Sequence, residues 1–133
     1  MNNKIDYKKL IQTAFKYQKN AYAPYSKFFV GAAVQTQNGK IYGGANIENA
    51  SYPCGICAER VALSKAITEG ETKFIALAIT SSGEDYTYPC GLCRQFLSEF
   101  GNFKVIIAKS LTDYKQFDVC ELLPSQFDKN NLK

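Results

Sequence analysis

Two Cys-x-x-Cys pairs hold the residues best suited to chemistry in this sequence. Cys54 and Cys57 form the first pair, and Cys90 and Cys93 form the second. Each pair precedes a stretch with helical spacing, and a helix N-terminus stabilises a thiolate through its unpaired N–H groups and positive dipole end. Both junctions can therefore present zinc ligands. Four cysteines would close a structural zinc site, whereas three would leave an open position for water.

The neighbours of the two pairs favour a site with three ligands. The sequence reads CAE at residues 57–59 and PCGLC at residues 89–93, the signature of zinc deaminases with a non-ligand glutamate as general acid and base. The pattern predicts Cys57, Cys90 and Cys93 as ligands of one Zn²⁺ ion. Zinc would lower the pKa of its bound water and produce hydroxide near neutral pH. Glu59 would accept that proton, protonate the substrate's ring nitrogen and deliver a proton to the departing amine.

Both arginines of the chain lie close to these cysteines. The sequence has 14 lysines, no histidine and only two arginines, Arg60 and Arg94. The absence of histidine excludes Ser-His-Asp and Cys-His catalysis. Three thiolates and Zn²⁺ carry a net charge of −1, which weakens the metal as a Lewis acid. A guanidinium that donates to a thiolate would offset this charge, and we expect Arg60 to do so, with Arg94 as the second candidate.

Length and composition indicate one soluble domain over residues 1–133. The net charge of +4 comes from scattered lysines, and a nucleic-acid face would need clustered positive charge. No apolar run reaches the ~20 residues of a membrane span. The first ten residues show no apolar signal-peptide core, which indicates a cytoplasmic protein. Five cysteines without an export signal argue against a disulfide framework, and Cys54 and Cys120 are expected as buried thiols.

Periodicity and turn residues predict the order α-β-β-α-β-α-β-β. Asp6 is a candidate N-cap for a first helix that contains Tyr7 and Gln18, and Asn38-Gly39 predicts a two-residue hairpin in which both residues have positive φ. The predicted strands are 28–36, 40–46, 74–81, 103–108 and 115–119, and the other helices are 57–69, with Val61, Ala62, Ala66 and Ile67 facing inward, and 90–100. Such an order favours a mixed sheet of about five strands with helices on its faces.

Six segments of the sequence resemble one known family. The segments APYSKF, VGAA, NIENASY, CAER, PCGLCRQ and ELLP lie in order between about residues 21 and 127. Together they resemble the small homotetrameric zinc cytidine deaminases. The resemblance implies the three-layer α/β/α cytidine deaminase fold, and conversion of cytidine and deoxycytidine to uridine and deoxyuridine in pyrimidine salvage.

The same resemblance implies roles for individual residues. Asn46 and Glu48 would hydrogen-bond the ribose 3′-hydroxyl, and Phe28 would pack against the pyrimidine. The Ala58 backbone N–H would meet the carbonyl oxygen of the base. Phe127 would reach the pocket of a neighbouring subunit, so that the tetramer completes its own sites. Cys54 departs from the family pattern, in which a residue other than cysteine stands at this position.

Three other functions stay open on the sequence alone. A non-catalytic zinc module with four cysteines would use Cys54 as a ligand. A nucleic-acid editing deaminase would take an unpaired base into a similar pocket, but the Glu48 carboxylate would repel a 3′-phosphodiester. A deaminase for another aminopyrimidine nucleoside would use the same chemistry on a different substrate.

Overall fold

Five strands form one mixed sheet in the computed structural model, which describes residues 4–133. The strand order is β2-β1-β3-β4-β5; β3 and β4 are parallel, and the other neighbouring pairs are antiparallel. The strands are β1 Val30–Thr36, β2 Ile41–Ala45, β3 Phe74–Ser81, β4 Lys104–Ala108 and β5 Tyr114–Asp118. The helices are α1 Tyr7–Gln18, η1 Tyr52–Cys54, α2 Ala58–Thr68, α3 Gly91–Ser98, α4 Val119–Leu122 and η2 Lys129–Leu132. The predicted mixed sheet of five strands is confirmed.

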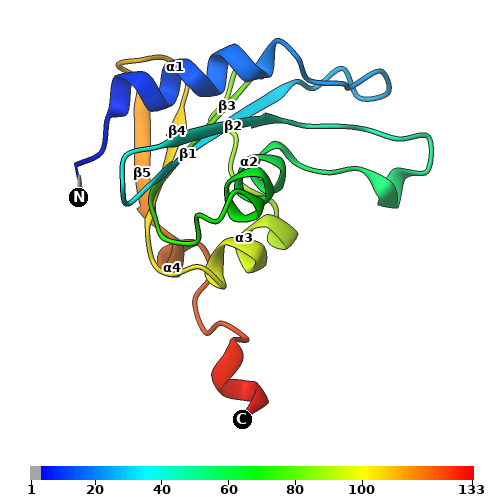
Figure 1. The fold of residues 1–133 in the computed structure, drawn as a ribbon. Helices are drawn as coiled ribbons and strands as arrows, with labels where there is room; N and C mark the ends of the chain where they lie inside the picture. The colour runs from blue at the N-terminus through cyan, green and yellow to red at the C-terminus, as the bar shows by residue number, and fades with distance from the viewer. Residues whose placement is uncertain (1–3) are drawn as a thin grey trace.

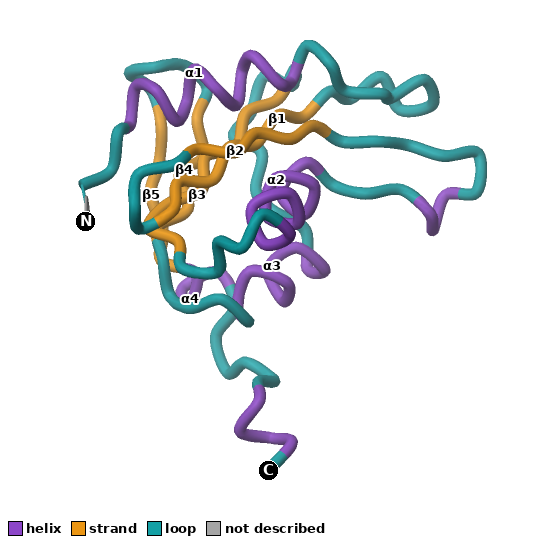
Figure 2. The backbone as a smooth tube through the Cα atoms, in the orientation of Figure 1, coloured by secondary structure: helices purple, strands orange, loops and turns teal. Residues whose placement is uncertain are grey.

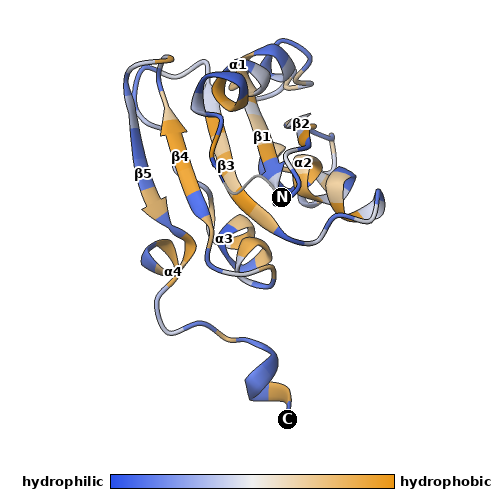
Figure 3. Cartoon of the chain, turned by 60° about the vertical axis from the view of Figure 1, so that its left-hand side comes forward, coloured by the Kyte–Doolittle hydropathy of each residue, from blue (hydrophilic) through white to orange (hydrophobic). Residues whose placement is uncertain are grey.

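Alternation along the three central strands gives the sheet two buried faces. One face packs against α1 and the opposite face against α2 and α3, which makes the three predicted layers (Figure 1). The side chains that face α2 and α3 include Val34, Leu77, Ile79, Val105 and Ile107. Figure 3 shows β3 and β4 as largely hydrophobic, whereas much of the edge strand β5 is hydrophilic. No helix within residues 4–133 has the length and apolar character needed to span a membrane.

The first helix lies almost directly on the sheet. The Asp6 carboxylate caps it by accepting a hydrogen bond from the Lys9 N–H at 3.2 Å, as predicted. A Cβ added at Gly31 on β1 would lie 1.9 Å from the Ala14 carbonyl oxygen, which leaves no space for a side chain there. Glycine therefore lets α1 and β1 approach backbone to backbone.

A second glycine sets the position of α2. A Cβ at Gly44 on β2 would lie 2.6 Å from the Ala62 nitrogen and 3.0 Å from the Ala58 carbonyl oxygen. The buried stripe of α2 consists of Ala58, Glu59, Ala62, Leu63 and Ala66. The prediction of Ala62 and Ala66 is confirmed. Ile67 is partly buried and packs against the same core, whereas Val61 is only partly buried. The buried face also includes Glu59 in the first turn and Leu63, which the predicted set of inward residues did not contain.

The start of β1 and the turn between β1 and β2 differ from their predictions for local reasons. The strand predicted from residue 28 begins at Val30, because Lys27 has a positive φ of 59° and turns the chain just before it. In the β1–β2 turn only Gly39 has positive φ, at 89°. The Gly39 N–H donates to the Thr36 carbonyl at 3.0 Å and the Thr36 N–H donates to the Lys40 carbonyl at 2.8 Å. This arrangement makes a longer turn than the predicted two-residue hairpin.

Two long loops, 19–29 and 46–57, run side by side away from the sheet (Figure 2). The Tyr22 N–H donates to the Asn46 carbonyl at 2.9 Å, and the Glu48 N–H donates to the Tyr22 carbonyl at 2.8 Å. Ile47 and Ile56 exchange two further backbone hydrogen bonds, of 3.0 and 2.9 Å. The two bonds of Tyr22 join the loops to each other, and the bonds between Ile47 and Ile56 close loop 46–57 beside the start of α2.

Candidate active site

Three thiols meet where α2 and α3 begin. Cys57 is the N-cap residue of α2, Cys90 is the N-cap residue of α3, and Cys93 lies in the first turn of α3. The Cys57 and Cys90 sulfurs are 3.7 Å apart, and all three sulfurs lie within 4.8 Å of one another. A tetrahedral zinc with Zn–S bonds of about 2.3 Å places its sulfurs about 3.8 Å apart. The three thiols therefore fit one zinc ion, as predicted.

The pKa values of the thiols of Cys57 and Cys93 are shifted in opposite directions, which favours a bound cation. Hydrogen bonds from Cys93, and then from Arg60 and Cys90, outweigh burial and lower the pKa of Cys57 to about 5. The pKa of Cys93 is raised, because Cys93 hydrogen-bonds to Cys57 and is buried. The Cys57 thiol thus ionises easily. Ionisation of the Cys93 thiol needs a positive charge nearby, which a metal ion would supply.

Arg60 lies against the thiol cluster. Its Nη2 atom donates to Cys57 Sγ at 3.8 Å, and hydrogen bonds to Cys57 and Cys93 raise the pKa of Arg60 against the opposing effect of desolvation. The Nε atom of Arg60 is buried and has no hydrogen-bond partner within residues 4–133. The guanidinium is placed where the sequence hypothesis requires it, beside the sulfur charge.

Arg94 supports the loop before Cys90. Unlike Arg60, it donates no hydrogen bond to a thiol within residues 4–133. Its Nε atom donates to the Pro89 carbonyl and its Nη1 atom to the Leu122 carbonyl, both at 2.8 Å. The two bonds join the residue before the metal ligand to α4. Arg94 thus positions the backbone, and the expectation that it donates to a thiolate is wrong because its guanidinium donates to the two carbonyl groups instead.

Glu59 is a buried carboxyl group beside the metal ligands. It is 4% exposed and lines a pocket of about 200 Å³ together with Phe28, Val30, Asn46, Cys57, Ala58, Thr87, Tyr88 and Cys90. Desolvation raises the pKa of Glu59 to about 7, and the charge on Cys57 acts in the same direction. A carboxyl group in this environment can both accept and donate a proton.

Three of the predicted substrate residues line the same pocket. The Asn46 side chain donates to the Phe28 carbonyl at 2.8 Å and accepts from the Val30 N–H at 2.9 Å. This amide therefore fixes the backbone on both sides of residue 29 and presents the Phe28 ring, which is 39% exposed. Ala58 is the first residue of α2, so its N–H is one of the donors without a partner inside the helix.

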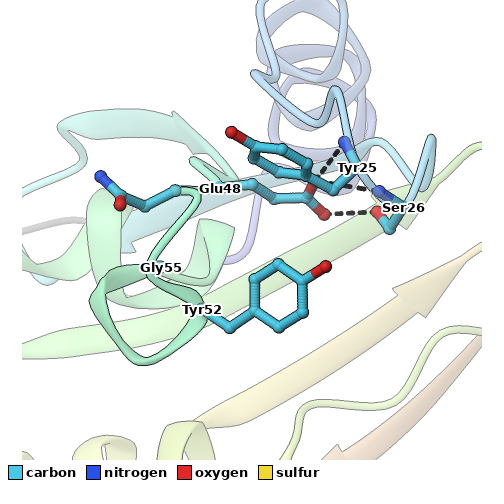
Figure 4. A pocket seen from close by; sticks show the side chains of 6 residues that line it. Tyr25, Ser26, Glu48, Tyr52 and Gly55 are labelled. Carbon is cyan, nitrogen blue, oxygen red and sulfur yellow. Dashed lines mark hydrogen bonds between the residues drawn. The ribbon is translucent and has the colours of Figure 1, made fainter.

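Glu48 lies in a different pocket, shown in Figure 4. This pocket of about 330 Å³ is lined by Tyr25, Ser26, Glu48, Asn49, Tyr52 and Gly55. The Glu48 carboxylate accepts hydrogen bonds from the N–H groups of Tyr25 and Ser26, both at 3.0 Å, and from the Ser26 hydroxyl. The Ser26 hydroxyl is the main reason that the pKa of Glu48 is lowered. The structure does not bring Asn46 and Glu48 into one pocket.

Phe127 lies outside both pockets of its own chain. It is 59% exposed, and its carbonyl accepts a hydrogen bond from the Gln95 side chain at 2.9 Å. The segment after α4 extends away from the sheet (Figure 1). Within residues 4–133 the Phe127 ring is therefore available to another molecule.

The remaining cysteines correct two expectations. Cys54 ends the short helix η1 and Cys120 lies on α4; both are exposed rather than buried. Cys54 is not part of the cluster of three thiols. The loop 46–57 stands away from the core, which explains why Cys54 remains at the surface. The arrangement disfavours the zinc module with four cysteine ligands.

Three residues of the Glu59 pocket, Val30, Thr87 and Tyr88, were not predicted as site residues from the sequence. Thr87 and Tyr88 line the pocket with Glu59, although they belong to the loop between β3 and α3. Their position directly before the PCGLC segment was the available signal. Residues directly before a metal ligand in the chain must lie close to the metal site, so this loop lines the pocket.

Comparison with known proteins assigns the family. Residues 4–109 match the model of the cytidine and deoxycytidylate deaminase zinc-binding region. The chain is 43% identical to the cytidine deaminase of Sporosarcina psychrophila over 130 residues, 96% of each chain, and 41% identical over 131 residues to a probable cytidine deaminase of Dictyostelium discoideum, covering 98% of this chain and 89% of that one.

A solved structure supports the same conclusion. The crystal structure of cytidine deaminase from Burkholderia pseudomallei superposes with a TM-score of 0.87 at 38% identity, over 92% of this chain and all of that one (100%). Sequence, fold and the cluster of three thiols agree. The chain belongs to the cytidine and deoxycytidylate deaminase family of zinc-dependent enzymes, with Cys57, Cys90 and Cys93 as the residues that can hold the zinc.

Proposed function

We propose that the protein hydrolyses free cytidine and deoxycytidine to uridine and deoxyuridine, as a step of pyrimidine salvage in the cytoplasm. The observation that carries the proposal is the buried Glu59 carboxyl group in one pocket with the thiols of Cys57 and Cys90. Relatives named cytidine deaminase are 40–43% identical over nearly the whole chain, which supports cytidine as the substrate. The whole chain, residues 1–133, acts as one domain in this proposal.

The proposed chemistry adds water to the amidine carbon of the base and releases ammonia. Cys57, Cys90 and Cys93 hold the zinc, which supplies a Lewis acid that makes water nucleophilic at neutral pH. Glu59 removes a proton from the attacking water and delivers it to the ring nitrogen next to the reacting carbon. A second proton moves through Glu59 to the amino group, the C–N bond breaks, and the new C–O bond becomes the carbonyl of uridine.

The pocket with Glu59 and the separate pocket with Glu48 together offer groups suited to a pyrimidine nucleoside. The Phe28 ring provides an apolar surface, and the free N–H of Ala58 is placed to donate to the carbonyl oxygen of the base. A carboxylate has about four lone-pair sites; Glu48 uses three of them within loop 19–29, which leaves one for a sugar hydroxyl. The substrates are one nucleoside and one water molecule.

The charge on Glu48 argues against nucleic acid as the substrate. Hydrogen bonds lower the pKa of this carboxyl group, so it is ionised at neutral pH and repels a phosphate at the sugar. The two arginines stand beside cysteines in the sequence, and the lysines are scattered along it without a cluster of positive charge. A higher rate on single-stranded DNA than on cytidine would refute this part of the proposal.

The proposed assembly is a homotetramer whose pockets are completed by neighbouring chains. Tyr22, Tyr25, Ile47, Tyr52 and Ile56 on loops 19–29 and 46–57 are between 41 and 76% exposed, and monomeric proteins seldom leave large apolar patches uncovered. Phe127 is free to enter a neighbour's pocket. Light scattering should give the mass of four chains, and a mass of one chain would contradict the assembly.

The direct test is deamination of free nucleosides. Purified, zinc-loaded protein should convert cytidine and deoxycytidine to the corresponding uridines with release of one ammonia per turnover, measured by chromatography. Cytidine 3′-phosphate serves as the matched comparison, because it differs only at the group that Glu48 should repel, and it should react at least tenfold more slowly. A folded, zinc-loaded protein that produces no uridine would refute the assignment.

Arg60 provides a separate prediction about the metal. Arg60→Gln removes the positive charge beside Cys57 and should increase the rate of zinc release to a chelator about tenfold, with a lower turnover number, since outer groups of metal sites typically contribute 10–100-fold. Lys65→Gln is the matched control on the same helix, where the ammonium lies 4.4 Å from the Tyr17 ring centre. Equal zinc release in wild type and Arg60→Gln would disprove the role of Arg60.

A further inference from the structure

Tyr88 is an aromatic residue of the pocket wall that no step of the proposed chemistry uses. It lies two residues before Cys90 and lines the pocket with Phe28 and Glu59. Its side chain is 42% exposed. The Tyr88 hydroxyl has no hydrogen-bond partner among residues 4–133, so the hydroxyl group holds no other described residue in place.

The backbone on both sides of Tyr88 is held in place. The Thr87 hydroxyl hydrogen-bonds to the Ser81 hydroxyl at the end of β3, with an oxygen separation of 2.5 Å. On the other side, the Pro89 carbonyl accepts the 2.8 Å bond from Arg94. Tyr88 is therefore anchored to the sheet through one neighbour and to α3 through the other.

The Tyr88 ring is held as well. It meets Phe117 on β5 in an edge-to-face contact, with ring centres 5.8 Å apart and an angle of 63° between the rings. Phe117 packs against the core between the sheet and the helices α2 and α3. Aromatic pairs of this geometry stabilise one another beyond simple burial. A ring fixed by its backbone and by a core neighbour forms a wall that does not withdraw easily from a substrate.

We infer that Tyr88 determines specificity by limiting the size of the substituent at C5 of the pyrimidine. The inference rests on the proposed function, in which the reacting carbon C4 lies beside the thiols. C4 has two ring neighbours, and Glu59 must reach one of them, the ring nitrogen. The other neighbour, C5, then faces the remaining wall beside Cys90, which Tyr88 provides.

The test compares cytidine with 5-methylcytidine in variants of residue 88. Tyr88→Ala should lower the ratio of the two kcat/KM values, cytidine over 5-methylcytidine, at least tenfold, since one methyl group in an apolar pocket is worth about 10–200-fold. Tyr88→Phe keeps the ring and should keep the ratio within twofold of wild type. Tyr7→Ala removes a half-buried tyrosine on α1, on the opposite face of the sheet, and should also leave the ratio unchanged.

A binding measurement makes the test independent of turnover. Calorimetric titration with uridine and 5-methyluridine should show the same tenfold change in relative affinity in Tyr88→Ala. If this variant does not fold, Tyr88→Leu, which has a narrower side chain, is used in its place. Unchanged ratios in both measurements would overturn the inference, whereas a wild-type protein that binds nucleosides without producing uridine would overturn the proposed function alone.

Discussion

Glu59→Gln should lower the turnover number for cytidine by about 10³-fold, within the range of 10²–10⁴ that general acid–base catalysis contributes. Glutamine has nearly the same shape as glutamate but can neither accept nor release the transferred proton. Steady-state kinetics with purified, zinc-loaded protein measures the effect. The zinc content should stay at one ion per chain, because Glu59 is outside the cluster of thiols.

The control for this variant is Glu69→Gln, at the exposed C-cap of the same helix. It removes an equal charge from α2 without touching the pocket and should keep wild-type kinetics. Turnover of Glu59→Gln within tenfold of wild type would mean that another group moves the protons. Loss of zinc in the same variant would instead assign Glu59 to the metal.

Cys90→Ser and Cys54→Ser should behave oppositely. Cys90 lies in the cluster of three thiols, and Cys54 does not. Replacing a thiolate ligand by a hydroxyl should weaken zinc binding by more than about 100-fold, the upper range for changes outside the first coordination shell, and turnover should fall with it. Cys54→Ser should retain the metal and wild-type turnover.

Two measurements distinguish a zinc site with three cysteine ligands from one with four. They are metal analysis after exposure to a chelator and cytidine turnover measured in parallel. Equal loss of zinc from both variants would support a closed site with four cysteine ligands. Such a site would have no open position for water, so the deaminase mechanism would fail with it.

Much of the metal site could be predicted from the sequence because its ligands are local. Cys57 with Glu59, and Cys90 with Cys93, are each fixed by the first turn of one helix, so their spacing already contains most of the geometry. What joins the two halves is tertiary packing of α2 and α3 on one face of the sheet. The family signature supplied that information, and the sulfur distance of 3.7 Å agrees with it.

The surroundings of the site were less predictable. The position of Glu48 depends on how loop 19–29 folds back over it. The three hydrogen bonds from Tyr25 and Ser26 cannot be predicted from the periodicity of the sequence. Tyr88 comes from an irregular loop whose path is set by Arg94 and Ser81. The inward face of α2 was predicted only in part, because Glu59, a charged residue, belongs to the buried stripe.

The missing side chain at Gly44 makes catalysis sensitive to a residue that carries no chemistry. Any Cβ there would meet the backbone of Ala58 and Ala62 at 3.0 Å or less. Relief of that clash would displace α2, and with it the N-cap thiol of Cys57 and the Glu59 carboxyl group. In a mutational scan scored by nucleoside turnover, position 44 should therefore tolerate as few residues as the reacting positions themselves.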